Sequence, residues 1–173
     1  MRKRVVILAS GAGSLTQAIL DATELDIQIV AVVSDKSDAQ VLERAKKANI
    51  NTSVIELKGD RVAWDRQLFD QVHQYQPDLV ISAGFMKILS SDFVSNFPTI
   101  NSHPALLPDF PGAHAVRDAL AAGVTTAFSS TLPELSGWLV RRSDFGSCQN
   151  AVEIFLAAAG LRPEMLGKAV KRF

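Results

Sequence analysis

The sequence predicts an α/β fold, a Rossmann-like, mostly parallel sheet with helices on both faces. Short apolar runs rich in β-branched residues alternate along the chain with segments of helical periodicity. This alternation is typical of parallel strands joined by right-handed helical crossovers. With 173 residues, 47% of them hydrophobic, the chain can bury one core, and we expect a single domain over residues 1–173.

The first four elements follow from periodicity. Val5–Ala9 is a short apolar run bounded by glycine, which predicts a buried parallel strand. A glycine-rich turn follows, and the apolar spacing over Leu15–Ala22 predicts a helix. Ile27–Ser34 predicts the second strand, and Val41–Ala48 predicts a helix with one apolar side.

The next elements continue the alternation. Thr52–Leu57 predicts a third strand, and Arg61–Tyr75 predicts a helix with one apolar stripe. Asp78–Ala83 is the clearest strand of the chain. Ser91–Asn96 predicts a short helix, capped by Ser90 or by its own first residue.

A fifth short strand is expected over Thr99–Ser102, and the pattern weakens further along the chain. Residues 5–124 therefore form the expected core, and residues 125–173 form an atypical tail. Within this tail, Ala151–Gly160 and Pro163–Lys171 have helical spacing.

Charge and cysteine content exclude several classes of protein. The 18 basic residues balance the 18 acidic ones, so we expect no nucleic-acid or membrane partner. The apolar run after Arg4 is too short for a signal peptide, and no run could span a bilayer. The single cysteine, Cys148, cannot form an intrachain disulfide, which favours a cytoplasmic location.

A glycine loop, Gly11-Ala12-Gly13-Ser14, joins the first strand to the first helix. Glycine lets a phosphate approach the backbone, and the helix N-terminus offers free N–H groups. We therefore favour binding of a monophosphate, although a tight turn that needs glycine only for its geometry is the alternative. Asp35 lies where a dinucleotide-binding protein has its ribose-binding acid, but position 16 lacks the third glycine of that fingerprint.

The segment Asn101-Ser102-His103-Pro104 follows the fifth strand. In extended backbone, Asn101 and His103 lie on the same side, where an amide and an imidazole could stabilise an oxyanion and transfer a proton. A hydrogen-bonded structural histidine is the alternative. The three histidines, His73, His103 and His114, lack metal-site spacing, so no metal is expected.

Three blocks of the sequence resemble one known family. They are Ser10–Ser14, Ser82–Leu89 and Ile100–Gly112. Their order and spacing are similar to those of the phosphoribosylglycinamide formyltransferases, or glycinamide ribonucleotide transformylases, which are folate-dependent. Related formyltransferases that act on other amines share Asn-x-His-Pro, but the short chain and the early glycine loop favour the ribonucleotide.

The resemblance implies a Rossmann-like formyltransferase fold and formyl transfer from 10-formyltetrahydrofolate, a co-substrate, to the amine of glycinamide ribonucleotide in purine biosynthesis. It implies small-molecule partners, no metal, and a monomer or homodimer. The implied catalytic residues are Asn101 and His103. The implied substrate-binding residues are Gly13, Ser14, Leu15, Gly84 and Pro104, with leucine at a position that is usually asparagine. The implied folate-binding residues are Arg61, Met86, Lys87, Ile88 and Leu89.

The tail departs from the family pattern. The family has a third catalytic residue, an aspartate in a glycine-rich loop, and residues 126–138 do not contain that pattern. We assign neither Glu134 nor Asp144 to this role. One hypothesis is a reading frame that slips after Val124, returns near Gln149 and then slips again, which resequencing the gene would test. A diverged tail is the alternative. A further alternative is a catalytically weak or inactive nucleotide-phosphate-binding protein.

Overall fold

The computed structural model describes residues 1–23, 25–102, 117–118, 121–122, 138–139 and 171–172. The chain divides into two compact units, Met1–Thr99 and Ile100–Phe173, and each is considered by itself. The prediction of a single domain therefore stays a prediction.

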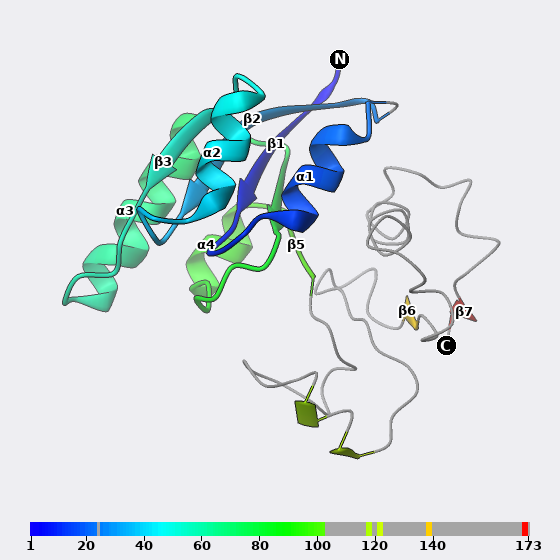
Figure 1. Cartoon of the computed structure of the whole chain (residues 1–173). Coiled ribbons are helices and arrows are strands. Elements are labelled where there is room, and N and C mark those ends of the chain that lie inside the picture. Colours follow the sequence, from blue (N-terminus) through cyan, green and yellow to red (C-terminus); the bar gives the residue numbers. More distant parts are fainter. Residues whose placement is uncertain (24, 103–116, 119–120, 123–137, 140–170, 173) are drawn as a thin grey trace. The chain divides into compact units, whose positions relative to one another are not determined.

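The sheet has five strands in the order β3-β2-β1-β4-β5 (Figure 1). The strands are β1 Lys3–Leu8, β2 Ile27–Ser34, β3 Asn51–Val54, β4 Leu79–Ser82 and β5 Thr99–Asn101. The pairings β1–β2, β1–β4 and β2–β3 are parallel, which confirms the predicted fold class. The chain winds outward from β1 to β3 and then returns to β4 on the other side of β1. The order of the strands therefore reverses between β1 and β4, and parallel sheets bind ligands beyond the carboxyl ends of the strands at such a point.

Four helices connect these strands. They are α1 Ser14–Asp21, α2 Gln40–Lys47, α3 Arg61–Gln74 and α4 Ser91–Asn96. The α3 stripe of Trp64, Leu68 and Val72 packs in one buried cluster with Val6 and Val80 of the sheet. On β1, the alternate residues that face away from this cluster are equally buried, so both faces of the sheet are covered.

Helix caps explain where two of the helices begin. The carboxylate of Asp60 accepts the backbone N–H groups of Val62 and Ala63 at the start of α3. The hydroxyl of Ser90 accepts the N–H of Phe93, which identifies Ser90 as the cap of α4.

Four strand predictions need correction. The predicted Asp78–Ala83 is one residue too long at each end, and the predicted Thr99–Ser102 is one residue too long at its end. β1 begins at Lys3, before the apolar run, and ends at Leu8. The strand predicted over Thr52–Leu57 spans Asn51–Val54. The N–H of Ile55 still donates to the carbonyl of Ser34 in β2 at 2.8 Å, and Leu57 packs against the α3 cluster outside the strand. The register of β1 on β2 also shifts by one residue between Val5 and Val6, an irregularity that the sequence pattern does not indicate.

In the second unit, the described residues form one short antiparallel pair. Strand β6, Trp138–Leu139, pairs with β7, Lys171–Arg172. The predicted helix over Pro163–Lys171 is therefore wrong at its last residue, because Lys171 pairs with Leu139 across the two strands. The rest of that helix and the one predicted over Ala151–Gly160 lie outside the described residues.

Candidate functional site

Two loops meet at the carboxyl ends of β1 and β4. Leu8 and Ser82 are paired at the ends of these neighbouring strands, so the glycine loop (residues 10–14) and the β4 loop (residues 83–89) leave the sheet side by side. The backbone N–H of Ser10 donates to the carbonyl of Gly84 at 3.2 Å. Its hydroxyl accepts the backbone N–H of Met86 at 2.8 Å. Ser10, to which the sequence pattern assigned no role, therefore joins the two loops at the point where the strand order reverses.

The glycine loop leaves the N-terminus of α1 open to an anion. Gly13 caps the helix with φ +72° and provides no side-chain hydrogen bond, and the first turn contains no acidic residue. Ser14 is exposed and Leu15 is half-buried. The N–H groups of a helical first turn have no partner within the helix, and together with the helix dipole they attract negative charge.

Helix α2 holds the glycine loop from behind. The N–H of Val41 donates to the carbonyl of Gly11 at 3.1 Å, and Arg44 donates to the carbonyl of Ala12 at 2.7 Å. A Cβ atom on Gly13 would lie 2.5 Å from Cγ2 of Val41, so only glycine fits there. The geometric reason for a glycine thus holds at this position, and phosphate binding by Gly13, Ser14 and Leu15 stays a prediction.

The β4 loop exposes apolar side chains while its backbone is held. Met86 is 65% and Ile88 83% exposed, so two large apolar side chains lie on the surface of one short loop. The guanidinium of Arg61 donates to the carbonyl oxygen of Ile88 and pairs with Asp65 at 2.9 Å. The same guanidinium lies 5.0 Å above the ring of Trp64. The structure thus places Arg61 beside the predicted folate segment, Met86–Leu89, and fixes it by contacts on several sides.

A buried carboxylate lies beneath this loop. The side chain of Asp35, directly after β2, is 1% exposed, and its Oδ2 atom lies 3.8 Å from the ammonium of Lys87. Within the described part of the chain, neither carboxylate oxygen accepts a hydrogen bond. A cavity of about 260 Å³ lies beside this pair. Its lining comprises Asp35, Lys36, Asp38, Glu56, Leu57, Lys58 and Lys87.

Glu56, on the same cavity, belongs to a separate polar cluster. Hydrogen bonds from Lys58 and from the hydroxyl of Ser37, together with the charge of Lys58, hold the pKa of Glu56 at about 2. Glu56 is therefore ionised at neutral pH.

The predicted catalytic pair is only half described. Asn101 is the last residue of β5 and is half-buried. His103 and Pro104 lie outside the described residues, so their position relative to Asn101 stays a prediction. His73 is exposed on α3, where its ring stacks on Phe69 at 6.0 Å.

Among the described residues, no three His, Cys, Asp or Glu side chains are grouped as a metal site would require. The helices of that same part of the chain include none with the length and apolarity needed to cross a membrane.

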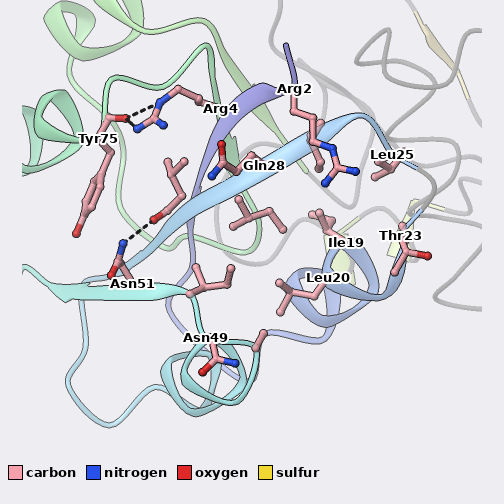
Figure 2. A pocket seen from close by; sticks show the side chains of 16 residues that line it. Arg2, Arg4, Ile19, Leu20, Thr23, Leu25, Gln28, Asn49, Asn51 and Tyr75 are labelled. Atoms are coloured by element: carbon pink, nitrogen blue, oxygen red, sulfur yellow. Dashed lines mark hydrogen bonds between the residues drawn. The ribbon is translucent and has the colours of Figure 1, made fainter.

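A second cavity, of about 780 Å³, lies at the opposite edge of the sheet. It surrounds the amino-terminal ends of β1 and β2 (Figure 2). The Nη2 atom of Arg4 in its wall is already bonded to the carbonyl oxygen of Tyr75 at 2.6 Å, and Asn51 donates to the carbonyl of Val30 at 3.3 Å (Figure 2). Parallel sheets bind their ligands at the carboxyl ends of the strands. The carboxyl edge, where the two loops and the smaller cavity lie, is therefore the better candidate for the functional site.

Comparison with known proteins identifies the family. The family model described as formyl transferase matches residues 3–131. The chain is 46% identical over 127 residues to the phosphoribosylglycinamide formyltransferase of Mycobacterium tuberculosis, an alignment that covers 70% of this chain and 59% of that protein. It is 44% identical over 126 residues to the enzyme of the same name from Escherichia coli, covering 69% of this chain and 59% of that protein. The chain thus spans about 59% of the length of these two relatives.

Solved structures lead to the same fold. The phosphoribosylglycinamide formyltransferase of Coxiella burnetii superimposes with a TM-score of 0.71 at 31% identity. The superposition covers 96% of this chain and 86% of that one.

Proposed function

The chain belongs to the formyl transferase family, and we propose that it transfers a formyl group from 10-formyltetrahydrofolate to the amine of glycinamide ribonucleotide, a step of purine biosynthesis. One observation supports this most directly: the glycine loop and the β4 loop lie together where the strand order reverses, and Ser10 bonds to both. One loop has the character of an anion site, and the other exposes apolar side chains. A reaction between a phosphorylated amine and a flat aromatic donor needs both surfaces next to each other.

The glycine loop would bind the ribonucleotide. The phosphate would accept N–H groups from the first turn of α1, with Gly13, Ser14 and Leu15 around it. Leu15 has no side-chain donor, so binding at that position depends on the backbone alone. Backbone groups of Gly84 and Pro104 would lie near the amine.

The β4 loop would bind the folate. The exposed apolar side chains of Met86 and Ile88 support contact with the pteridine ring, and Leu89 is half-buried behind them. Arg61, which already holds the Ile88 carbonyl, would lie near the anionic tail. Lys87, between Met86 and Ile88, is the remaining residue of the proposed folate site.

The chemistry would depend on Asn101 and His103. The amine attacks the formyl carbon, and the carbonyl oxygen becomes an oxyanion that the amide of Asn101 and a protonated His103 stabilise. As the oxyanion collapses to the new amide, the bond to the folate nitrogen breaks and His103 gives its proton to that nitrogen. The proton lost by the attacking amine then replaces it on His103. These steps need no metal ion.

A turnover assay tests this proposal. The protein is mixed with glycinamide ribonucleotide and 10-formyltetrahydrofolate, and release of tetrahydrofolate is followed. Loss of one oxyanion donor in Asn101→Ala should lower kcat by about 10²–10³-fold, and His103→Ala should lower it at least as much. His73→Ala, which changes an exposed histidine on α3, is the matched control and should keep wild-type turnover. A His103→Ala variant with wild-type turnover would refute the catalytic assignment.

Binding and turnover distinguish the active enzyme from the alternative of a phosphate-binding protein. The residues expected to supply the third catalytic acid lack the family pattern, and such an acid would orient His103 and keep it charged. Calorimetry with glycinamide ribonucleotide therefore accompanies the assay. Binding without turnover would favour the inactive protein, and absence of both would refute the proposed substrate.

We also propose a cytoplasmic location and a monomeric or homodimeric state. A reducing compartment suits a chain with one cysteine. Light scattering at several protein concentrations distinguishes the two states.

A further inference from the structure

We propose that Asp35 is a positioning residue, which holds the β4 loop in its ligand-binding conformation through the ammonium of Lys87. This inference deepens the proposed function, because it rests on the β4 loop being the folate site. The sequence suggested a different role for Asp35, as a ribose-binding acid.

Three consecutive residues of the β4 loop are tethered to three different elements. The N–H of Met86 is bonded to the hydroxyl of Ser10, just after β1. The ammonium of Lys87 pairs with Asp35, just after β2. The carbonyl of Ile88 accepts a hydrogen bond from Arg61 at the start of α3. The backbone is thus held at Met86 and Ile88, and the side chain is held at Lys87, while the apolar side chains are exposed, as a preorganised ligand surface requires.

The Asp35 tether is poorly suited to a purely structural role. A carboxylate that is 1% exposed loses nearly all of its hydration, and neither oxygen accepts a hydrogen bond in the described part of the chain. The distance of 3.8 Å to Lys87 is too long for a hydrogen bond. Burial of a charge with so little compensation lowers the stability of a fold. A group that costs stability and faces a ligand loop is typical of a functional site.

The surroundings of Lys87 explain why a charge is needed there. Its side chain is one-third exposed and lines the cavity of about 260 Å³, so it has room for other rotamers. Exposed lysine side chains lose conformational entropy when they are ordered, and an attractive charge must offset that loss. The buried carboxylate provides this attraction from beneath the loop.

The experiment combines three variants with one control. Asp35→Asn keeps the shape of the side chain and removes its charge, and Lys87→Met removes the partner. The double variant removes both. Asp38→Asn is the matched control, because Asp38 is an exposed acid on the same cavity and the ion pair of Lys87 is with Asp35.

Steady-state kinetics and urea unfolding should respond differently to Asp35→Asn, with weaker folate binding but no loss of stability. For Asp35→Asn we expect the KM for 10-formyltetrahydrofolate to rise about tenfold, within the range for residues that modulate a site indirectly, with kcat nearly unchanged. Its urea midpoint should stay constant or increase. Lys87→Met should raise KM and lower the midpoint, because it leaves the carboxylate without a counter-charge. The double variant should regain the midpoint with a KM no higher than that of Lys87→Met.

A second measurement is independent of folate. Hydrogen exchange of a peptide that spans the β4 loop should be faster in Asp35→Asn than in the wild type and Asp38→Asn. Unchanged exchange together with an unchanged KM would overturn the positioning role, and so would a lower midpoint in Asp35→Asn, which would indicate a structural ion pair. If the wild-type protein does not use 10-formyltetrahydrofolate, the proposed function fails, and exchange alone then decides whether Asp35 holds the loop.

Discussion

Replacing Gly13 with alanine should destabilise the protein by about 2–5 kcal/mol, the sum of a backbone cost and a packing cost. Gly13 has φ +72°, a left-handed conformation that costs an alanine about 1–2 kcal/mol. The added Cβ would lie 2.5 Å from Cγ2 and 2.6 Å from Cβ of Val41. Val41 is fully buried, and its N–H is bonded to Gly11, so neither the side chain nor the start of α2 can move freely. Crowding of this kind costs about 1–3 kcal/mol in a packed core.

Alanine substitutions at two other glycines, Gly84 and Gly11, separate the backbone cost from the packing cost. Gly84 also has φ +72°, but nothing lies within 4 Å of a Cβ added there, so Gly84→Ala should lose only the backbone cost. Gly11 has no positive φ and equally open space, so Gly11→Ala should be nearly neutral. Urea unfolding of the three variants measures the free energies. Equal losses for Gly13→Ala and Gly84→Ala would refute the argument from the Val41 contact.

Other perturbations test the remaining contacts. Ser10→Ala removes the acceptor of a part-buried loop amide and should cost about 1–3 kcal/mol in urea unfolding, with Ser10→Thr as the variant that keeps the hydroxyl. Asp60→Ala removes the cap of α3 and should cost about 1 kcal/mol, whereas Asp60→Asn should lose much less. The pKa of Glu56 is held at about 2 by Lys58 and Ser37, so its contribution to stability is present above pH 4.5 and is lost as the pH falls towards 2. Melting temperatures from pH 2 to 6 should therefore change less in Glu56→Gln than in the wild type, and parallel curves would contradict this reasoning.

Local pattern was sufficient to predict most of the fold. Ile27–Ser34 is a strand over the predicted residues, because a segment so rich in β-branched residues between polar turns has few alternatives. The stripe on α3 faces the core as its spacing indicates. The predicted strand to Leu57 is too long because burial and strand pairing are different properties. Ile55 makes a last hydrogen bond to Ser34, and Leu57 is partly buried against the core without extending β3. The pattern of apolar residues along the sequence indicates which residues are buried, but not which of them pair with a neighbouring strand.

The part of the candidate site that is built from consecutive residues could be predicted from the sequence. The glycine loop follows β1 as the pattern indicated, and Gly13 has the positive φ that glycine permits. The partners of the β4 loop could not be predicted this way, because Asp35 and Lys87 are far apart in sequence. Their proximity depends on β2 and β4 lying on the two sides of β1, which the strand order decides and no local spacing indicates.

The environment of Trp64 gives the protein an internal optical signal. The indole N–H is bonded to the carbonyl of Ile55 at 2.7 Å, and its ring stacks on Phe85 with centroids 6.3 Å apart. Phe85 immediately precedes the exposed residues of the β4 loop, and the Arg61 cation lies over the indole. Since the chain has two tryptophans, Trp138→Phe leaves Trp64 as the one tryptophan. Tryptophan fluorescence of that variant should therefore respond to changes in the β4 loop from within the hydrophobic core, with no attached dye.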